Sequence, residues 1–255
     1  MILCMDIGNT NITMGGFAGD DLAFVARMAT DTAATEDEYA SRILSILNMH
    51  GAGRRSIEGA IVSSVVPQLN QVVRQALRFA YGVEALMVGP GIRTGLNIRC
   101  DDPSSVGADL ICASVAAYRL YGGPSLVVDL GTATKLLVVD QNGAFIGASI
   151  APGVGIALRA LSEGTAQLPQ ISLEAPRSVL GRNTVDCIRS GVIFGNACMI
   201  DGMIDRINAE MGRELPVCAT GGLAPVILPY CRHAMTPEPD LVLWGLYFLY
   251  RKNCL

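Results

Sequence analysis

The sequence predicts an α/β protein built from two similar halves, each with three antiparallel strands followed by helices. An apolar strand runs into Asp6-Ile7-Gly8-Asn9-Thr10, and two further strand-like segments follow it. The same order restarts at Asp129-Leu130-Gly131-Thr132. An internal repeat of this length determines the fold class, and it differs from the strand–helix alternation of a simple doubly wound sheet. We therefore expect halves at 1–122 and 123–255, divided at Gly122-Gly123-Pro124.

The first half contains apolar or alternating segments separated by turns that are rich in Gly and Asp. Its expected elements are strands at 2–7, 11–17, 22–28, 59–65 and 85–88, and helices at 36–49, 67–80 and 106–121. Thr35 is the expected N-cap of the first helix, with Glu38 at the capping-box position. The loop 89–103 is rich in Gly, Asn, Asp and Pro, and its length suggests a function.

The second half repeats the three strands and then continues with helical patterns. Its expected elements are strands at 126–128, 135–140, 144–150 and 216–220, and helices at 184–211 and 241–250. The 184–211 segment carries too many apolar residues for one narrow stripe, so part of it should be covered by a second layer or by another subunit. A break near Gly191 or Gly195 is also consistent with its sequence.

Bulk composition limits the class of protein. The chain has 255 residues, 51% of them hydrophobic, and a mean hydropathy of +0.40. No uninterrupted apolar run is long enough to span a bilayer, and Leu241–Tyr250 reaches only about half the length of a membrane helix. The first five residues contain no basic segment or cleavage signature, so we expect a cytoplasmic protein.

The cysteine and charge patterns argue against a zinc-binding or disulfide-bonded protein and against a nucleic-acid-binding protein. The eight cysteines form no Cys-x-x-Cys pair, and the chain has only two histidines, so reduced, buried cysteines are favoured over zinc or disulfides. Cys112, Cys187 and Cys198 lie in apolar helical patterns and should behave as small hydrophobic residues. The net charge of −4, with scattered Lys and Arg, disfavours nucleic acid as a partner.

The repeated Asp-x-Gly-x-Thr turn suggests a nucleotide site. Its carboxylate can hold a cation, its glycine lets the backbone approach an anion, and its amides and hydroxyl can donate to phosphate oxygens. Alone, each copy is equally consistent with an ordinary turn, but two copies facing each other across a cleft would bind a polyphosphate and its metal. A third strand breaks into Gly221-Gly222, against which a nucleobase and ribose can lie. The set matches neither a Walker A loop nor a dinucleotide fingerprint.

A candidate base follows the long loop. Gly107-Ala108-Asp109 opens a helix, and kinases usually orient the attacking hydroxyl with a carboxylate. The alternative is that Asp109 is a first-turn residue favoured by the helix dipole.

Taken together, these motifs resemble those of the type III pantothenate kinase family, over residues 1 to about 250. The matching motifs are Asp6-Ile7-Gly8-Asn9-Thr10, Gly107-Ala108-Asp109, Asp129-Leu130-Gly131-Thr132-Ala133, Pro152-Gly153, Gly181-Arg182-Asn183-Thr184 and Thr220-Gly221-Gly222-Leu223-Ala224. The resemblance implies a duplicated ribonuclease H-like fold of the actin/hexokinase/Hsp70-like superfamily, with ATP in a cleft between the halves. It also implies phosphorylation of pantothenate to 4′-phosphopantothenate, the first step towards coenzyme A.

The resemblance further implies roles for individual residues and cofactors. The expected ATP-binding residues are Asp6, Gly8, Asn9, Thr10, Asn11, Thr13, Thr132, Gly221 and Gly222. The expected pantothenate-binding residues are Cys100, Gly107, Ala108, Asp109, Leu110 and Thr184, with Asp109 as the catalytic base. Mg²⁺ and a monovalent cation (K⁺ or NH₄⁺) are the expected metals, with Asp6 and Asp129 as ligands. Thr184 would reach pantothenate across a homodimer interface formed by the 184–211 helix.

Three positions depart from the family pattern. Leu110 stands where the family has Arg, Cys100 lies near the position of a Tyr, and Lys135 replaces a second Thr. Loss of the Arg removes a charge-assisted bond worth about 1.5–3 kcal/mol. Two alternatives therefore stay open: a kinase for another small hydroxylated acceptor, and a non-catalytic regulator that binds nucleotide.

Overall fold

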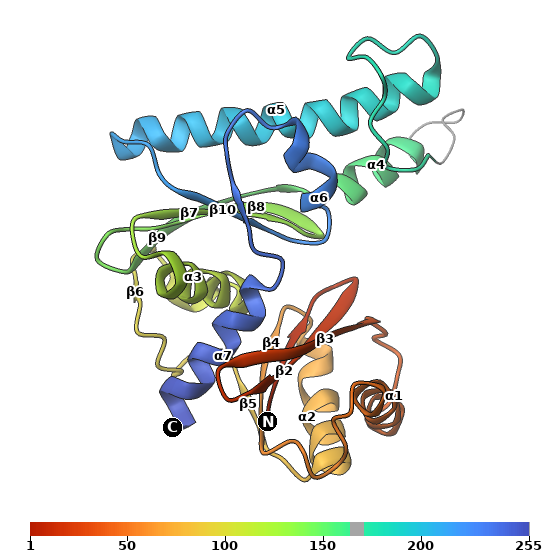
Figure 1. The fold of residues 1–255 in the computed structure, drawn as a ribbon, viewed down its shortest axis with the longest axis vertical. Coiled ribbons are helices and arrows are strands. Elements are labelled where there is room, and N and C mark those ends of the chain that lie inside the picture. Colours follow the sequence, from red (N-terminus) through yellow and green to blue (C-terminus); the bar gives the residue numbers. More distant parts are fainter. Residues whose placement is uncertain (164–170, 255) are drawn as a thin grey trace. The chain divides into compact units, whose positions relative to one another are not determined.

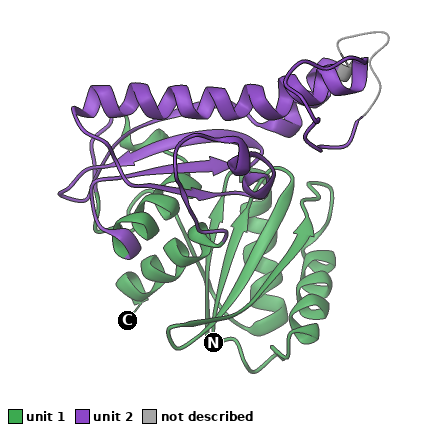
Figure 2. Ribbon diagram, turned by 45° about the horizontal axis from the view of Figure 1, so that its top comes forward, with its two compact units in different colours: residues 1–96, 101–119, 240–255 green, residues 97–100, 120–239 purple. Residues whose placement is uncertain are grey.

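A computed structural model describes residues 1–163 and 171–254 of the chain, which are arranged in two units (Figures 1 and 2). Unit 1 comprises residues 1–96, 101–119 and 240–255, and unit 2 comprises residues 97–100 and 120–239. This division differs from the expected halves in three places, the first being that residues 120–122 belong to unit 2. The C-terminal helix belongs to unit 1, and a short segment of the long loop belongs to unit 2.

Unit 1 is built on a five-stranded sheet with the order β3-β2-β1-β4-β5. The strands are β1 (Ile2–Ile7), β2 (Asn11–Ala18), β3 (Asp21–Ala29), β4 (Gly59–Ser64) and β5 (Ala85–Met87). The first three pair in antiparallel fashion, whereas β4 pairs parallel to both β1 and β5. Helices α1 (Glu36–Met49) and α2 (Pro67–Tyr81) supply the crossovers that the parallel strands need.

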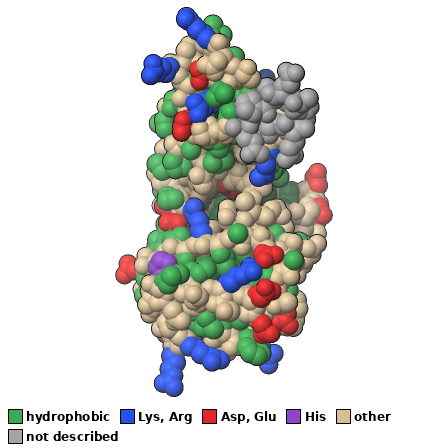
Figure 3. Space-filling view, turned by 90° about the vertical axis from the view of Figure 1, so that its right-hand side faces the viewer, with side chains coloured by type: hydrophobic (Ala, Val, Ile, Leu, Met, Phe, Trp, Pro, Cys, Tyr) green, Lys and Arg blue, Asp and Glu red, His purple; other side chains and the backbone are tan. Residues whose placement is uncertain are grey.

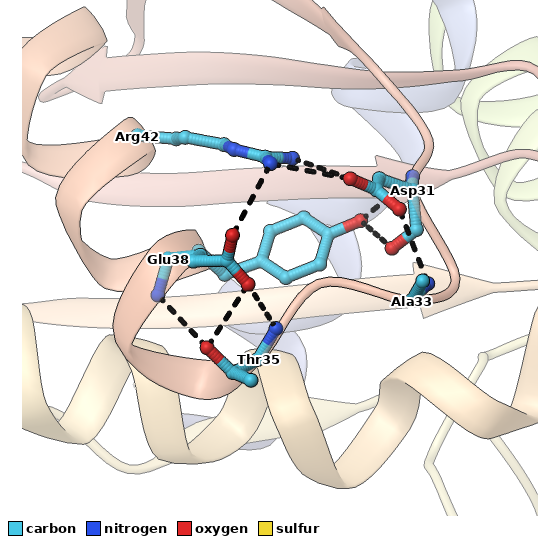
Figure 4. Close-up of polar contacts among 6 residues, drawn as sticks. Asp31, Ala33, Thr35, Glu38 and Arg42 are labelled. Carbon is cyan, nitrogen blue, oxygen red and sulfur yellow. Dashed lines mark hydrogen bonds and ion pairs between the residues drawn. The ribbon is translucent and has the colours of Figure 1, made fainter.

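Helix α1 begins at the predicted capping box (Figure 4). The Thr35 hydroxyl accepts from the Glu38 N–H, and the Glu38 carboxylate accepts from the Thr35 N–H at 2.8 Å. Arg42 donates to the Asp31 carboxylate at 3.2 Å, which ties the helix to the chain leaving β3. Two backbone N–H groups that the helix cannot satisfy itself are thereby bonded, and the predicted start of α1 is confirmed.

The C-terminal helix α7 (Leu241–Cys254) packs against β1 and β4 on the face of the sheet opposite α1 and α2 (Figure 1). Tyr247 stacks on Phe17 with ring centroids 4.2 Å apart. Gly245 lies against the backbone of Cys112, where a β-carbon would overlap the carbonyl group. Helix α3 (Ala108–Tyr121) can approach α7 closely for this reason.

Unit 2 repeats the topology of unit 1. Its strands are β6 (Asn97–Ile98), β7 (Ser125–Leu130), β8 (Ala133–Val139), β9 (Ala144–Pro152), β10 (Val217–Thr220) and β11 (Thr236–Pro237). The sheet order is β11-β10-β7-β8-β9-β6, with an antiparallel β7–β8–β9 meander and with β10 and β11 parallel to β7. Strand β6 is an added edge strand beside β9, in the 89–103 segment where the sequence predicts only a loop. The duplicated ribonuclease H-like fold is confirmed.

Helix α5 (Thr184–Met211) is continuous, without a break at either internal glycine. It lies along the sheet of unit 2 (Figure 1), and Ile193, Ile200 and Ile204 are fully buried in the core beneath it. By length and composition α5 could cross a membrane, which corrects the expectation that no segment could. A search for uninterrupted apolar runs does not find α5, because scattered polar residues interrupt its apolar sequence. One of these, Asp201, is buried and accepts the backbone N–H groups of Arg232 and His233, as in a core helix.

The cysteines differ from expectation in exposure. All eight are free, and burial raises the pKa of the Cys4 thiol well above its ordinary value. Cys112 is buried as predicted, but Cys187 and Cys198 are exposed, because they lie on the face of α5 opposite the core.

On the face drawn in Figure 3, Lys and Arg side chains are dispersed and do not form one basic patch.

Candidate active site

The first Asp-x-Gly-x-Thr turn joins β1 to β2 in unit 1. Its backbone closes through the Gly8 N–H, which donates to the Asn11 carbonyl at 3.0 Å. Thr30 supports it from the end of β3, because its hydroxyl donates to the Gly8 carbonyl at 2.6 Å and its N–H donates to the Thr10 carbonyl. A side chain on Gly8 would lie 3.1 Å from the Asn11 carbonyl oxygen, so the turn favours glycine.

The turn presents polar groups to solvent. Asn9, Thr10 and Asn11 are exposed, while Asp6 and Thr13 are partly buried and lie directly opposite each other on β1 and β2. Exposed amides and hydroxyls on a fixed turn suit the oxygens of a phosphate chain.

Asp109 lies in the first turn of α3, also in unit 1. Its Oδ1 accepts from the Leu110 N–H at 2.9 Å. A β-carbon on Gly107 would lie 2.6 Å from this oxygen, so the glycine leaves the space that the carboxylate occupies. The contact gives a local steric reason for glycine at position 107, and the pantothenate contact expected of Gly107 and Ala108 stays a prediction.

Cys112 shows that two predicted site carboxylates lie in one neighbourhood. Its pKa is raised first by complete burial, and then by the negative charges of Asp6 and Asp109. The structure thus brings together the metal ligand expected on β1 and the base expected on α3.

Leu110 points into the protein interior. Its side chain is 8% exposed and begins the run of buried residues on α3. The position therefore offers an apolar contact where an Arg would offer charge.

The second Asp-x-Gly-x-Thr turn joins β7 to β8 in unit 2. Asp129 lies directly opposite Lys135 in the antiparallel register, and the Lys135 Nζ is 2.7 Å from the Asp129 Oδ2. The two side chains are only 12% and 15% exposed, respectively. The carboxylate that was expected to hold a potassium or ammonium ion is therefore bound by a lysine ammonium group.

Two glycines fix the surroundings of this turn. A β-carbon on Gly153 would overlap the Thr132 carbonyl, so the Pro152-Gly153 motif supports the turn from β9. Gly221 has a φ of +96°, and a β-carbon there would lie 2.5–2.6 Å from backbone atoms of Leu130. The Leu223 N–H donates to the Leu130 carbonyl at 3.1 Å. The glycine motif and the second turn are thus adjacent in unit 2.

The backbone at Gly222 is open, since a β-carbon there would meet no atom within 4 Å. The space beside this backbone is therefore open to a ligand. The helix expected after the glycines is one turn, α6 (Ala224–Ile227), followed by a short 3₁₀ segment.

The remaining predicted residues lie on other elements of unit 2. Cys100 follows the edge strand β6 and is partly buried. Thr184 begins α5 and lines an open, largely apolar groove of about 450 Å³ between α5 and α4 (Val154–Glu163). Ala157, Ile188 and Val192 line the same groove.

Sequence reasoning missed Thr30 and the contact between Lys135 and Asp129. Nothing in the residues around Thr30 indicates that it supports a turn twenty residues away. The lysine had a usable signal, because Asp129 and Lys135 are spaced symmetrically about the hairpin turn and must pair across it.

Comparisons with known proteins agree in both sequence and fold. A family model described as type III pantothenate kinase matches residues 2–206. The type III pantothenate kinase of Moorella thermoacetica is 42% identical over 253 residues, covering 99% of this chain and all of that protein. The type III pantothenate kinase of Frankia alni is 43% identical over 254 residues, with the same coverage. Component A of the Acidaminococcus fermentans (R)-2-hydroxyglutaryl-CoA dehydratase has a similar fold, with a TM-score of 0.59 at 14% identity, covering all of this chain and 99% of that one.

Proposed function

Because the chain belongs to the type III pantothenate kinase family, we propose that it transfers the γ-phosphoryl group of ATP to the hydroxyl of pantothenate. The products are ADP and 4′-phosphopantothenate, and the reaction is the first step towards coenzyme A. The observation that carries this assignment to specific residues is the shared neighbourhood of Asp6 and Asp109 beside Cys112 in unit 1.

Each motif then has a role in the transfer. Asp109 accepts the proton of the pantothenate hydroxyl as its oxygen bonds to the γ-phosphorus, and the bond from that phosphorus to the β–γ bridging oxygen breaks. The turn at Gly8–Asn11 and Thr13 on β2 bind phosphate oxygens in unit 1. Thr132 and the Gly221-Gly222 backbone contact ATP in unit 2. In-line transfer needs positioning and charge stabilisation more than covalent help from the protein.

Mg²⁺ fits the residues of unit 1. Mg²⁺ is commonly held by one or two carboxylates together with substrate phosphates, so a single carboxylate such as Asp6 can contribute to its site. Mg²⁺, when bound, would neutralise phosphate charge, and the Asp6 carboxylate on β1 would hold it.

An acceptor panel tests the proposed function. The purified protein is given ATP, Mg²⁺ and KCl, and ADP release is followed with pantothenate and with other small hydroxylated compounds. Among these compounds, we expect only pantothenate to cause ADP release. ADP release with a different compound would indicate the second candidate function, a kinase for another acceptor. This candidate is motivated by the buried Leu110, where the family has Arg, and by Cys100, which lies near the position of a Tyr. Nucleotide binding without any release would favour the non-catalytic regulator.

We also propose that α5 forms the two-fold interface of a homodimer, in which Thr184 contacts pantothenate bound to the partner. The face of α5 opposite the core exposes Cys187, Gly191, Gly195 and Cys198 at helical spacing. These short side chains let a second helix approach closely. Ile200 is fully buried in its own protomer, so it belongs to the core of unit 2 and not to this surface.

Gly195→Arg tests the interface. No atom lies within 4 Å of a β-carbon built at Gly195, and Arg is the better helix former by about 1 kcal/mol, so the protomer should fold. At a two-fold contact the charge is introduced twice, and we expect monomers with strongly reduced activity. The control is Glu210→Arg on the exposed end of the same helix. Light scattering should give the wild type a mass near twice 26.9 kDa; an active wild type at the mass of one chain contradicts the interface.

A further inference from the structure

The ion pair beside the second turn has an unusual position for a lysine. Lys135 and Lys252 are the two lysines of the chain, and all other basic side chains apart from the histidines are Arg. Lys252 is exposed, whereas Lys135 is largely buried, with its Nζ 2.7 Å from the Asp129 Oδ2. A long ammonium side chain is normally kept in water, so its burial here requires the carboxylate as partner.

The backbone holds this pair in place. Asp129 and Lys135 are cross-strand partners on β7 and β8, and the Gly131 N–H donates to the Ala133 carbonyl at 3.2 Å to close the turn between them. Because the side chains are only 12% and 15% exposed, dissolved salt screens the pair weakly. The Lys135 ammonium therefore stays paired with the Asp129 carboxylate at ordinary ionic strength.

A lysine ammonium and a small monovalent cation do the same electrostatic work at such a carboxylate. Both carry one positive charge, and the lysine presents N–H donors as an ammonium ion does. A dissolved cation would have to displace the Lys135 ammonium from Asp129, and the positive charge of that ammonium would repel it. The residues present therefore do not fit a separate K⁺ or NH₄⁺ at this position.

We propose that Lys135 is a built-in replacement for the monovalent cation, so that nucleotide binding and turnover in this chain are independent of K⁺ and NH₄⁺. The inference rests on the proposed function for the identity of the nucleotide, ATP. It concerns the charge beside the second turn, however, and its test uses ATP binding without pantothenate. Failure of pantothenate turnover would leave that test intact.

Two substitutions separate charge from space. Lys135→Thr removes the ammonium and leaves room for an ion beside Asp129, whereas Lys135→Met removes the charge but fills the room with a similar apolar stem. ATP affinity is measured by calorimetry with Mg²⁺ in tetramethylammonium chloride, whose cation is too large for such a site, and then with KCl or NH₄Cl at the same ionic strength. Lys252→Thr is the matched control at the other lysine.

The wild type and Lys252→Thr should bind ATP equally well in all three salts. Lys135→Thr should bind about ten- to a hundredfold more weakly in tetramethylammonium chloride, the range for a lost charge-assisted contact, and K⁺ or NH₄⁺ should restore the affinity. Lys135→Met should be equally weak without such rescue. The proposal is overturned if K⁺ strengthens ATP binding to the wild type severalfold, or if Lys135→Thr binds ATP normally in tetramethylammonium chloride.

Discussion

Asp109→Asn should lower the rate of phosphoryl transfer by about 10²–10⁴-fold, the usual loss when a positioned base is removed. The amide has the shape of the carboxylate and still offers an oxygen to the Leu110 N–H, which the Asp109 carboxylate accepts at 2.9 Å. The start of α3 should therefore survive, and the melting temperature should change little. The rate constant from ADP release and the melting temperature are measured on the same preparation.

Asp37→Asn is the matched control for this substitution. Asp37 is an exposed first-turn residue of α1, so the same chemical change is made in the same helical position away from the site. It should leave both the rate and the melting temperature unchanged. Near-normal activity of Asp109→Asn would remove Asp109 from the mechanism and would favour the helix-dipole explanation of its position.

Gly221→Ala should destabilise the protein by about 3 kcal/mol or more. A residue with a side chain at a left-handed φ costs about 1–2 kcal/mol by itself. The φ here is +96°, and the added β-carbon would also lie 2.5–2.6 Å from three backbone atoms of Leu130, at the end of β7. Because those atoms belong to a central strand, they cannot move away without disturbing the second turn. Denaturant unfolding measures the loss, and nucleotide affinity should fall with it.

Gly222→Ala separates the fold from the ligand at the same motif. A β-carbon at Gly222 would meet nothing within 4 Å, so its stability should stay within about 0.5 kcal/mol of the wild type, as for most surface changes. If the open backbone receives the nucleotide, Gly222→Ala should still weaken ATP binding. Equal stability losses for the two variants would contradict the account of this motif.

The sequence predicted most of the fold because its signals are local and were present twice. The Asp-x-Gly-x-Thr turns, the alternation in the strands that follow, and the capping box at Thr35 all act within a few residues. Each local signal is weak alone, but the same order of elements occurs in both halves, and this repetition predicts the topology. The two sheets confirm it.

The missing parts depend on contacts between distant segments. The close packing of α7 on α3 depends on Gly245 fitting against the Cys112 backbone, which no sequence spacing reveals. Apolar character alone does not say which face of α5 meets the core, so the expectation that Cys198 is buried was wrong. At the site, the residue types were predictable, but the bond between Lys135 and Asp129 needed the hairpin register.

The most direct test of the proposed function is to identify the product itself. The wild type is incubated with ATP, Mg²⁺, KCl and pantothenate, and the mixture is analysed by mass spectrometry beside an Asp109→Asn incubation of equal concentration. We expect 4′-phosphopantothenate in the wild-type reaction, in an amount equal to the ADP formed, and little or none with the variant. A folded wild type that binds ATP but forms no 4′-phosphopantothenate under these conditions would contradict the proposed function.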